Sequence, residues 1–137
     1  MTIFNEFSRL AQVAIRNPVN SFINDQKLSD EWQSLRFHSK PDLEKSINEF
    51  IEFKKLLDNT EIEIIELPSS DNLTIDSIYT RDSILISPKG LILCNMGRAS
   101  RTPEAKNNSE YLKSLGHEVA GKILAPGTLE GGDFIWL

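Results

Sequence analysis

Six short segments of the chain either alternate between apolar and polar residues or are apolar almost without interruption. Such segments, bounded by proline, glycine or asparagine, are typical of β-strands. They are residues 10–15, 61–67, 83–87, 90–94, 117–124 and 134–137. Pro88-Lys89-Gly90 joins the third segment to the fourth and predicts a hairpin. Because these two segments are nearly continuous in hydrophobicity, we expect both of their faces to be covered.

Helical periodicity separates the strands. The clearest helix opens with proline and an acidic residue, and its apolar residues then recur at helical spacing, with the stem of Lys54 along the stripe. Ser29 is expected to cap a shorter helix, and Gly116 to end a third one. The predicted helices cover residues 30–36, 39–57 and 102–115. Strands that alternate with helices in this way predict an α/β fold, here in a single domain of residues 1–137.

Size and composition limit the function classes. A chain of 137 residues with 39% hydrophobic and 26% charged residues is typical of one soluble globular domain. The net charge of -5 argues against nucleic acid as a main partner and is compatible with a small cationic ligand. One cysteine, Cys94, excludes an internal disulfide framework. Without a long apolar run or a signal peptide at the N-terminus, we expect a cytoplasmic protein with no membrane contact.

Two acidic segments carry the candidate chemistry. The first runs from Asp76 to Asp82 and ends where the hairpin begins. The second, Glu130-Gly131-Gly132-Asp133, precedes the last apolar run. Glycine lets a ligand approach the backbone closely, so this turn could hold Glu130 and Asp133 in fixed directions. Taken singly, each segment also fits an ordinary surface turn, since turns favour these residue types.

Basic residues accompany the acids. Arg81 lies beside Asp82, where it could equally be a solvated surface residue. Arg98 and Arg101 follow the hairpin. Arginine can grip a substrate carboxylate through two parallel hydrogen bonds, although a plain basic loop is the commoner arrangement.

In this order, the segments resemble the guanidino-group modifying enzymes, which include arginine deiminases, dimethylarginine dimethylaminohydrolases and amidinotransferases. The resemblance is carried by residues 78–82, the apolar hairpin, residues 98–101 and residues 129–133. The early strand, the Trp32 region and the amphipathic helix also match how such chains begin. Nearly all of this chain is covered, but only about the first half of a typical family member. The resemblance implies about half of a five-bladed α/β propeller, built from strand-strand-helix-strand units around a polar channel.

The resemblance also implies a reaction that needs no cofactor and no metal. A cysteine near the family's C-terminus attacks the guanidinium carbon and expels ammonia or an amine, with a histidine as acid and base. Water or an acceptor amine then resolves the covalent intermediate. Asp82 takes the position of the guanidinium-binding aspartate, and Glu130 that of the acid that binds substrate and supports the histidine. The remaining candidates for the substrate-binding region are Asp76, Arg81, Asp133, Arg98 and Arg101, with Asp133 expected mainly to orient the turn.

The chemistry of the guanidinium group supports acidic residues at such a site, independently of the resemblance. A guanidinium is planar, permanently charged and presents forked N–H donors, so carboxylates in its plane hold it best. The chain departs from the family at two positions. Arg81 stands where dimethylarginine dimethylaminohydrolases usually carry an acid, which is closer to the arginine deiminases. The family's carboxylate-gripping arginine would fall near Asn95.

The nucleophile and the general acid are expected outside this chain. Cys94 ends an apolar strand and should pack as a small hydrophobe. His38 and His117 lie in no thiol or acid motif, and two scattered histidines with one cysteine make no metal ligand set.

Three interpretations therefore stay open. The chain is the N-terminal part of a hydrolase or of an amidinotransferase, or a non-catalytic binding module, or an α/β domain whose acidic turns are only structural. The first two predict a small guanidino ligand, and the last predicts none. Unpaired terminal strands of a half-propeller would also favour a homo-oligomer.

Overall fold

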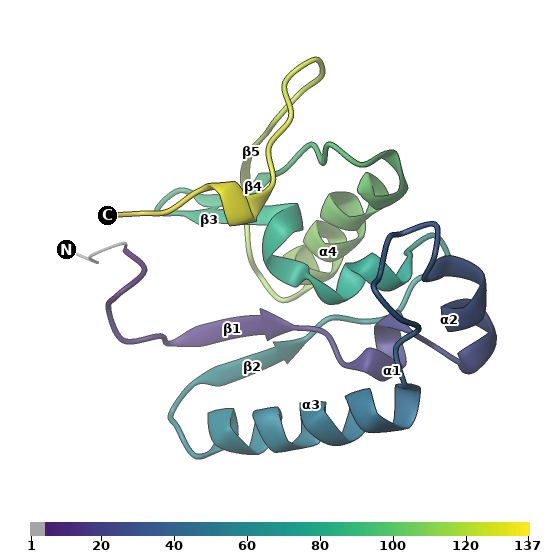
Figure 1. Cartoon of the computed structure of the whole chain (residues 1–137). Coiled ribbons are helices and arrows are strands. Elements are labelled where there is room, and N and C mark those ends of the chain that lie inside the picture. Colours follow the sequence, from purple (N-terminus) through teal and green to yellow (C-terminus); the bar gives the residue numbers. More distant parts are fainter. Residues whose placement is uncertain (1–4) are drawn as a thin grey trace. The chain divides into compact units, whose positions relative to one another are not determined.

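The computed structural model describes residues 5–137, and their backbone contacts divide them into two compact units. One unit is Leu10–Ile78, and the other joins residues 5–9 to Tyr79–Leu137. Each unit contains its own small sheet and its own helices (Figure 1). The α/β class predicted from the sequence is therefore confirmed. No helix in the described part of the chain is both long and apolar enough to cross a membrane.

The unit Leu10–Ile78 is built on a parallel pair of strands. Strand β1 (Gln12–Ile15) pairs with β2 (Glu63–Glu66), with Val13 opposite Ile64. Helix α3 (Leu43–Asp58) makes the crossover between them, as its amphipathic pattern predicted. The side chain of Asp42 caps α3 by accepting a hydrogen bond from the Lys45 amide. The core of the unit contains Phe22, Leu28, Leu35 and Ile75.

The short helices of this unit lie earlier in the chain than predicted. Helix α1 (Pro18–Ser21) follows β1 directly, and α2 spans Asp25–Glu31. The side chain of Asn24 caps α2, whereas Ser29 lies inside the helix and donates its hydroxyl to the carbonyl of Asp25. The expected helix at residues 30–36 is therefore wrong in position, because Asn24 caps the helix and so includes Leu28, which is 0% exposed in the core. A 3-10 helix, η1 (Ile75–Ile78), ends the unit.

The second unit is built on a three-stranded sheet in the order β3-β4-β5. Strands β3 (Ile84–Ser87) and β4 (Gly90–Leu93) form the predicted antiparallel hairpin. Helix α4 (Pro103–Ser114) then carries the chain to β5 (Val119–Lys122), which pairs parallel to β4 (Figure 1). Gly90 has φ +120, and a β-carbon there would lie 2.5 Å from the Glu118 carbonyl oxygen, so the hairpin turn requires glycine.

Three 3-10 helices complete this unit, and they carry most of the candidate site residues. They are η2 (Thr80–Ser83), η3 (Ala99–Arg101) and η4 (Gly131–Asp133). The buried core beside them contains Leu85, Cys94 and Met96, so the packing role expected for Cys94 is confirmed.

Two expectations for this unit are wrong. The outer part of β3 is not covered on both faces, because Ile86 is 56% exposed. Residues 134–137 form no strand among the described residues, since no neighbouring backbone pairs with them. Instead the indole of Trp136 donates a 2.9 Å hydrogen bond to the Ile86 carbonyl, and its ring packs edge-on against Phe134 with centroids 4.8 Å apart.

Candidate functional site

Helix η2 presents Asp82 at the entrance to β3. The hydroxyl of Ser83 donates to the Thr80 carbonyl at 3.1 Å and closes the turn. The Cys94 amide donates to the Ser83 carbonyl at 3.0 Å and extends the β3–β4 ladder to this point. The Asp82 side chain is 23% exposed, so its carboxylate lies at the boundary between the core and solvent.

The two acidic segments meet, although Asp82 and Gly131 lie 49 positions apart in the chain. A β-carbon at Gly131 would overlap the carbonyl oxygen of Arg81, and one at Gly132 would lie 2.9 Å from Asp82 Oδ1. Only residues without a side chain allow this approach. The Gly-Gly pair is therefore required by the contact between η4 and η2.

Glu130 immediately precedes this contact. Its side chain is half-buried, and a β-carbon at Gly97 would lie 3.9 Å from its Oε1 atom. Within residues 5–137 the Glu130 carboxylate makes no hydrogen bond or ion pair. Asp133, by contrast, is exposed, and it contributes to the turn through its amide, which donates to the Glu130 carbonyl at 3.0 Å. Glu130 is thus a carboxylate that an external cation can bind without displacing a protein group.

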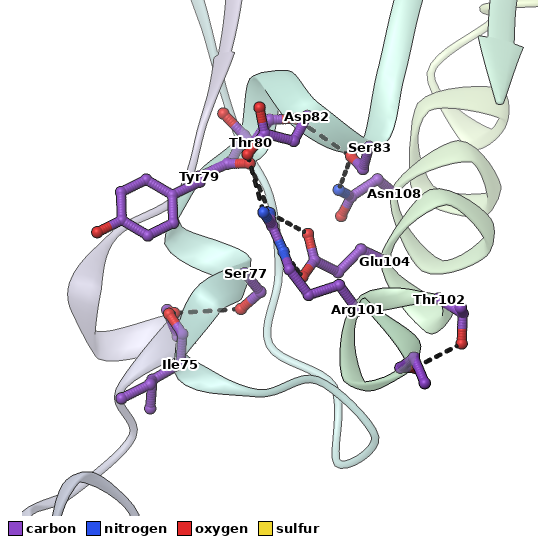
Figure 2. Close-up of polar contacts among 12 residues, drawn as sticks. Ile75, Ser77, Tyr79, Thr80, Asp82, Ser83, Arg101, Thr102, Glu104 and Asn108 are labelled. Atoms are coloured by element: carbon purple, nitrogen blue, oxygen red, sulfur yellow. Dashed lines mark hydrogen bonds and ion pairs between the residues drawn. The ribbon is translucent and has the colours of Figure 1, made fainter. Parts of the chain in front are cut away.

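Arg101 lies at the centre of a buried polar cluster (Figure 2). Its Nε and Nη2 atoms donate to the two oxygens of Glu104 at 2.8 and 2.9 Å. Its Nη1 donates to Asp82 Oδ2 at 2.8 Å, and Nη2 also reaches the Tyr79 carbonyl at 3.1 Å. Burial alone would lower the pKa of Arg101, but the hydrogen bonds and charges of Glu104 and Asp82 outweigh it and raise the pKa above its usual value.

The structure thus gives Arg101 a set of internal partners. A contact between Arg101 and a substrate carboxylate, expected from the sequence, stays a prediction. Arg98 is exposed and precedes η3, and its substrate contact likewise stays a prediction.

Sequence reasoning missed two buried polar residues of α4. Glu104 is 0% exposed, and Asn108, one helical turn later, is 2% exposed and donates to the Ser83 hydroxyl at 2.9 Å. Glu104 lies in the helix predicted at residues 102–115, and no role in the site was expected for it. The signal that could have identified it is spacing: Arg101 and Glu104 are three residues apart, and Asn108 follows four residues later on the same face as the buried Leu112.

The two remaining candidates, Arg81 and Asp76, lie outside the polar cluster around Arg101. Arg81 is mostly exposed, and its Nη2 atom donates to Glu6 Oε2 at 2.9 Å and to the Phe134 carbonyl at 3.0 Å. Asp76 is 3% exposed and lies in η1, which belongs to the unit Leu10–Ile78. Roles in substrate binding for both residues stay predictions.

Cys94 is a poor nucleophile in this environment. Burial raises the pKa of its thiol, the hydrogen bond from the Leu85 backbone opposes this in part, and the negative charges of Asp82 and Glu130 also raise the pKa. His38 is exposed and His117 is half-buried, and within residues 5–137 neither imidazole makes a hydrogen bond or an ion pair. The described residues also contain no group of three or more His, Cys, Asp and Glu that could hold a metal ion.

We therefore expect Cys94 to react slowly with a thiol reagent in the folded protein. At pH 8, alkylation by iodoacetamide should be at least about tenfold slower than in the urea-unfolded chain, because the thiol is buried and its pKa is raised. Mass spectrometry of timed samples measures the two rates. Equal rates under folded and unfolded conditions would contradict this account of Cys94.

Comparison with known proteins gives one family. Residues 17–134 match the family described as N,N dimethylarginine dimethylhydrolase, eukaryotic. A curated relative, the N(G),N(G)-dimethylarginine dimethylaminohydrolase of Pseudomonas aeruginosa, is 27% identical over 96 residues. That alignment covers 70% of this chain and 37% of the relative.

Solved structures share the fold. A dimethylarginine dimethylaminohydrolase from Pseudomonas aeruginosa, a cysteine-to-serine variant complexed with citrulline, superposes with a TM-score of 0.71 at 26% identity, over 90% of this chain and 46% of that one. A dimethylarginine dimethylaminohydrolase adduct with S-methyl-L-thiocitrulline superposes with a TM-score of 0.75 at 24% identity, over 94% of this chain and 48% of that one. An arginine dihydrolase of cyanobacteria superposes with a TM-score of 0.60 at 10% identity, over 90% of this chain and 16% of that one. The chain thus spans less than half the length of each.

Proposed function

Because the chain belongs to the N,N dimethylarginine dimethylhydrolase family, we propose that it carries the guanidinium-binding acids of a hydrolase that acts on arginine or an arginine derivative. The bond to be cleaved is a C–N bond at the guanidino carbon. The observation that carries the proposal is the meeting of Asp82 with Gly132, next to the carboxylate of Glu130, which makes no hydrogen bond or ion pair in the described part of the chain. The two carboxylates can accept hydrogen bonds from a planar cation, and the glycines leave room for it to approach the backbone.

The hydrogen-bonding capacity of the two acids supports this assignment. Arg101 occupies Oδ2 of Asp82, and no donor within residues 5–137 occupies Oδ1, the atom that lies near Gly132. The Glu130 carboxylate is likewise available. A ligand guanidinium has several N–H donors in one plane and can bind more than one carboxylate oxygen at once. The proposed ligand therefore replaces water on oxygens that the protein leaves open.

For the fold, we propose part of an α/β propeller built from repeated units. The order β3, β4, α4, β5 supports this, since it is one strand-strand-helix-strand unit with an antiparallel hairpin and a parallel return strand. Asp82 lies just before β3, the first strand of this strand-strand-helix-strand repeat, and Glu130 follows β5, its last strand. A propeller built this way would bring such connections together around its axis.

In the proposed mechanism, the nucleophilic cysteine and the acid–base histidine come from residues outside these 137. Cys94 is unsuited to the role, as its burial and raised pKa indicate. The thiolate would add to the guanidino carbon, and the histidine would protonate the departing amine. Water would then hydrolyse the amidino–cysteine intermediate. Glu130 would bind the guanidinium and support the histidine, and Asp82 would keep the substrate cation oriented.

Binding measurements on this chain test the proposal. Isothermal titration with arginine, agmatine and N(G),N(G)-dimethyl-L-arginine should detect binding by the wild-type chain. Glu130→Gln is expected to weaken it by roughly 10- to 100-fold, the effect of losing charge-assisted hydrogen bonds. Because no group within residues 5–137 binds the Glu130 side chain, the substitution should leave the fold intact.

Glu118→Gln is the matched control, since it removes the same charge from an exposed position of the same unit. Its affinity should stay within about threefold of wild type, because exposed charges interact weakly through solvent. A folded wild-type chain that binds none of the three compounds would contradict the proposal. So would equal losses in both variants, which would reduce the role of Glu130 to a general effect of net charge.

A further inference from the structure

We propose that Glu104 is a positioning residue that keeps the Arg101 guanidinium from occupying both carboxylate oxygens of Asp82, so that Asp82 Oδ1 can bind the guanidinium of a ligand. This inference rests on the function proposed above, since it concerns the same carboxylate. It assigns a role to a buried acid that itself would not touch the ligand.

Arg101 is chemically a competitor of the proposed ligand. It is a permanently charged guanidinium, and its Nη1 atom lies 2.8 Å from Asp82 Oδ2. Arginine and a carboxylate prefer a two-bond arrangement in which both carboxylate oxygens are used. If Arg101 bound Asp82 in that way, Oδ1 would no longer be open to an external guanidinium.

Glu104 prevents this by taking the forked edge of Arg101 itself. Both carboxylate oxygens of Glu104 are engaged, by Nε at 2.8 Å and by Nη2 at 2.9 Å. The Tyr79 carbonyl accepts a further hydrogen bond from Nη2 at 3.1 Å, so Nη1 alone reaches Asp82 and forms a single bond (Figure 2). Glu104 is 0% exposed in the first turn of α4, so packing holds its side chain in this position.

The charges of the cluster lead to the same conclusion. Asp82, Glu104 and Arg101 together carry one net negative charge, which favours a cation beside Asp82. Without the charge of Glu104, Arg101 would neutralise Asp82 completely, and the attraction for a ligand guanidinium would be lost. Because the cluster is mostly buried, solvent screens these interactions little.

The same face of α4 also fixes the end of η2. Asn108 donates to the Ser83 hydroxyl at 2.9 Å, next to Asp82 in the chain. The Tyr79 carbonyl at the start of η2 accepts from Arg101 Nη2 at 3.1 Å. Asn108 of α4 and Arg101 of η3 therefore hold η2 at its two ends, and Glu104 of α4 sets how Arg101 lies.

Neutralising Glu104 tests the inference. Affinity for arginine and N(G),N(G)-dimethyl-L-arginine is measured by isothermal titration, with folding checked by circular dichroism. Glu104→Gln should weaken binding by about tenfold or more, because Arg101 then turns both donors to Asp82. Glu110→Gln, an exposed change in the same helix, should stay within about threefold of wild type.

A second-site change separates competition from a purely structural role. In the double variant Glu104→Gln/Arg101→Met the competitor is gone, so affinity should return to within about threefold of wild type. A structural role for Glu104 predicts that the double variant binds no better than Glu104→Gln. That result, or unchanged binding in Glu104→Gln, would overturn the inference.

Nuclear magnetic resonance of the wild-type chain gives a further test that needs neither variant nor ligand. If Glu104 holds Arg101, the Arg101 Nε–H proton should exchange with solvent at least about 100-fold more slowly than that of an exposed arginine. Exchange at the exposed rate would overturn the inference by itself. If the wild-type chain binds no guanidino compound, the function proposed above fails, whereas slow exchange would still support the hold of Glu104 on Arg101.

Discussion

Replacing Arg101 with methionine is expected to lower the free energy of unfolding by about 3–5 kcal/mol. The substitution keeps much of the side-chain volume but removes the charge that pairs with Glu104 at 2.8 Å in the buried cluster, where Glu104 is 0% exposed. A buried carboxylate without a partner is costly because it has lost its hydration and gains nothing in return. Urea unfolding followed by circular dichroism measures the change.

Lys106→Met is the control for this prediction. Lys106 lies in the same helix and faces Glu110 at 3.8 Å, but both side chains are exposed, so its loss should cost less than about 1 kcal/mol. The double variant Glu104→Gln/Arg101→Met should be more stable than Arg101→Met alone, since removing both charges leaves no uncompensated ion at Glu104. A single Arg101→Met variant as stable as the Lys106 control would show that the cluster is not a buried ion pair in solution.

Replacing Gly131 with alanine is expected to separate the two acidic segments. The new β-carbon would overlap the carbonyl oxygen of Arg81, and a backbone atom cannot rotate away as a side chain can. We expect a loss of about 1–3 kcal/mol in unfolding free energy together with at least tenfold weaker guanidinium binding, because η4 must move away from η2 and from Asp82. Urea unfolding and isothermal titration measure the two effects.

Gly121→Ala provides the comparison for this substitution. Gly121 lies in β5, and a β-carbon there would have no heavy atom within 4 Å. Its stability should stay within about 0.5 kcal/mol of wild type, and its ligand affinity should not change. If Gly131→Ala behaved like Gly121→Ala, the close approach of η4 to η2 would not exist in the folded protein.

Local signals were sufficient for much of the fold. Helix α3 was identified from its apolar stripe and from the proline and acidic residue at its start, although it begins at Leu43 rather than at residue 39, and α4 was identified from the proline at its start and Gly116 at its end. The hairpin of β3 and β4 followed from two apolar runs around a turn that needs glycine at Gly90. These features depend on residues close in sequence, whose steric and hydrogen-bonding preferences act wherever the chain folds.

Features that depend on contacts between residues distant in sequence were harder to predict from the sequence. Residues 134–137 have the composition of a strand, but a strand exists only when another backbone pairs with it, and here the segment contacts β3 through the Trp136 indole instead. The start of α2 was misplaced because Asn24 and Ser29 are both suitable caps, and only the packing of Leu28 into the core selects one.

The sequence by itself determined the two acidic segments, the glycines between Glu130 and Asp133, and the family to which their order points. Only the tertiary structure decided which of these charges are internal and which are open to a ligand. Arg101 carried the same signal as Arg98 in the sequence, yet its guanidinium is bound by Glu104 and Asp82. The reason is physical: the residue type supplies the charge, but the partner of a charge depends on burial and on distances that arise only when helix, turn and sheet pack together.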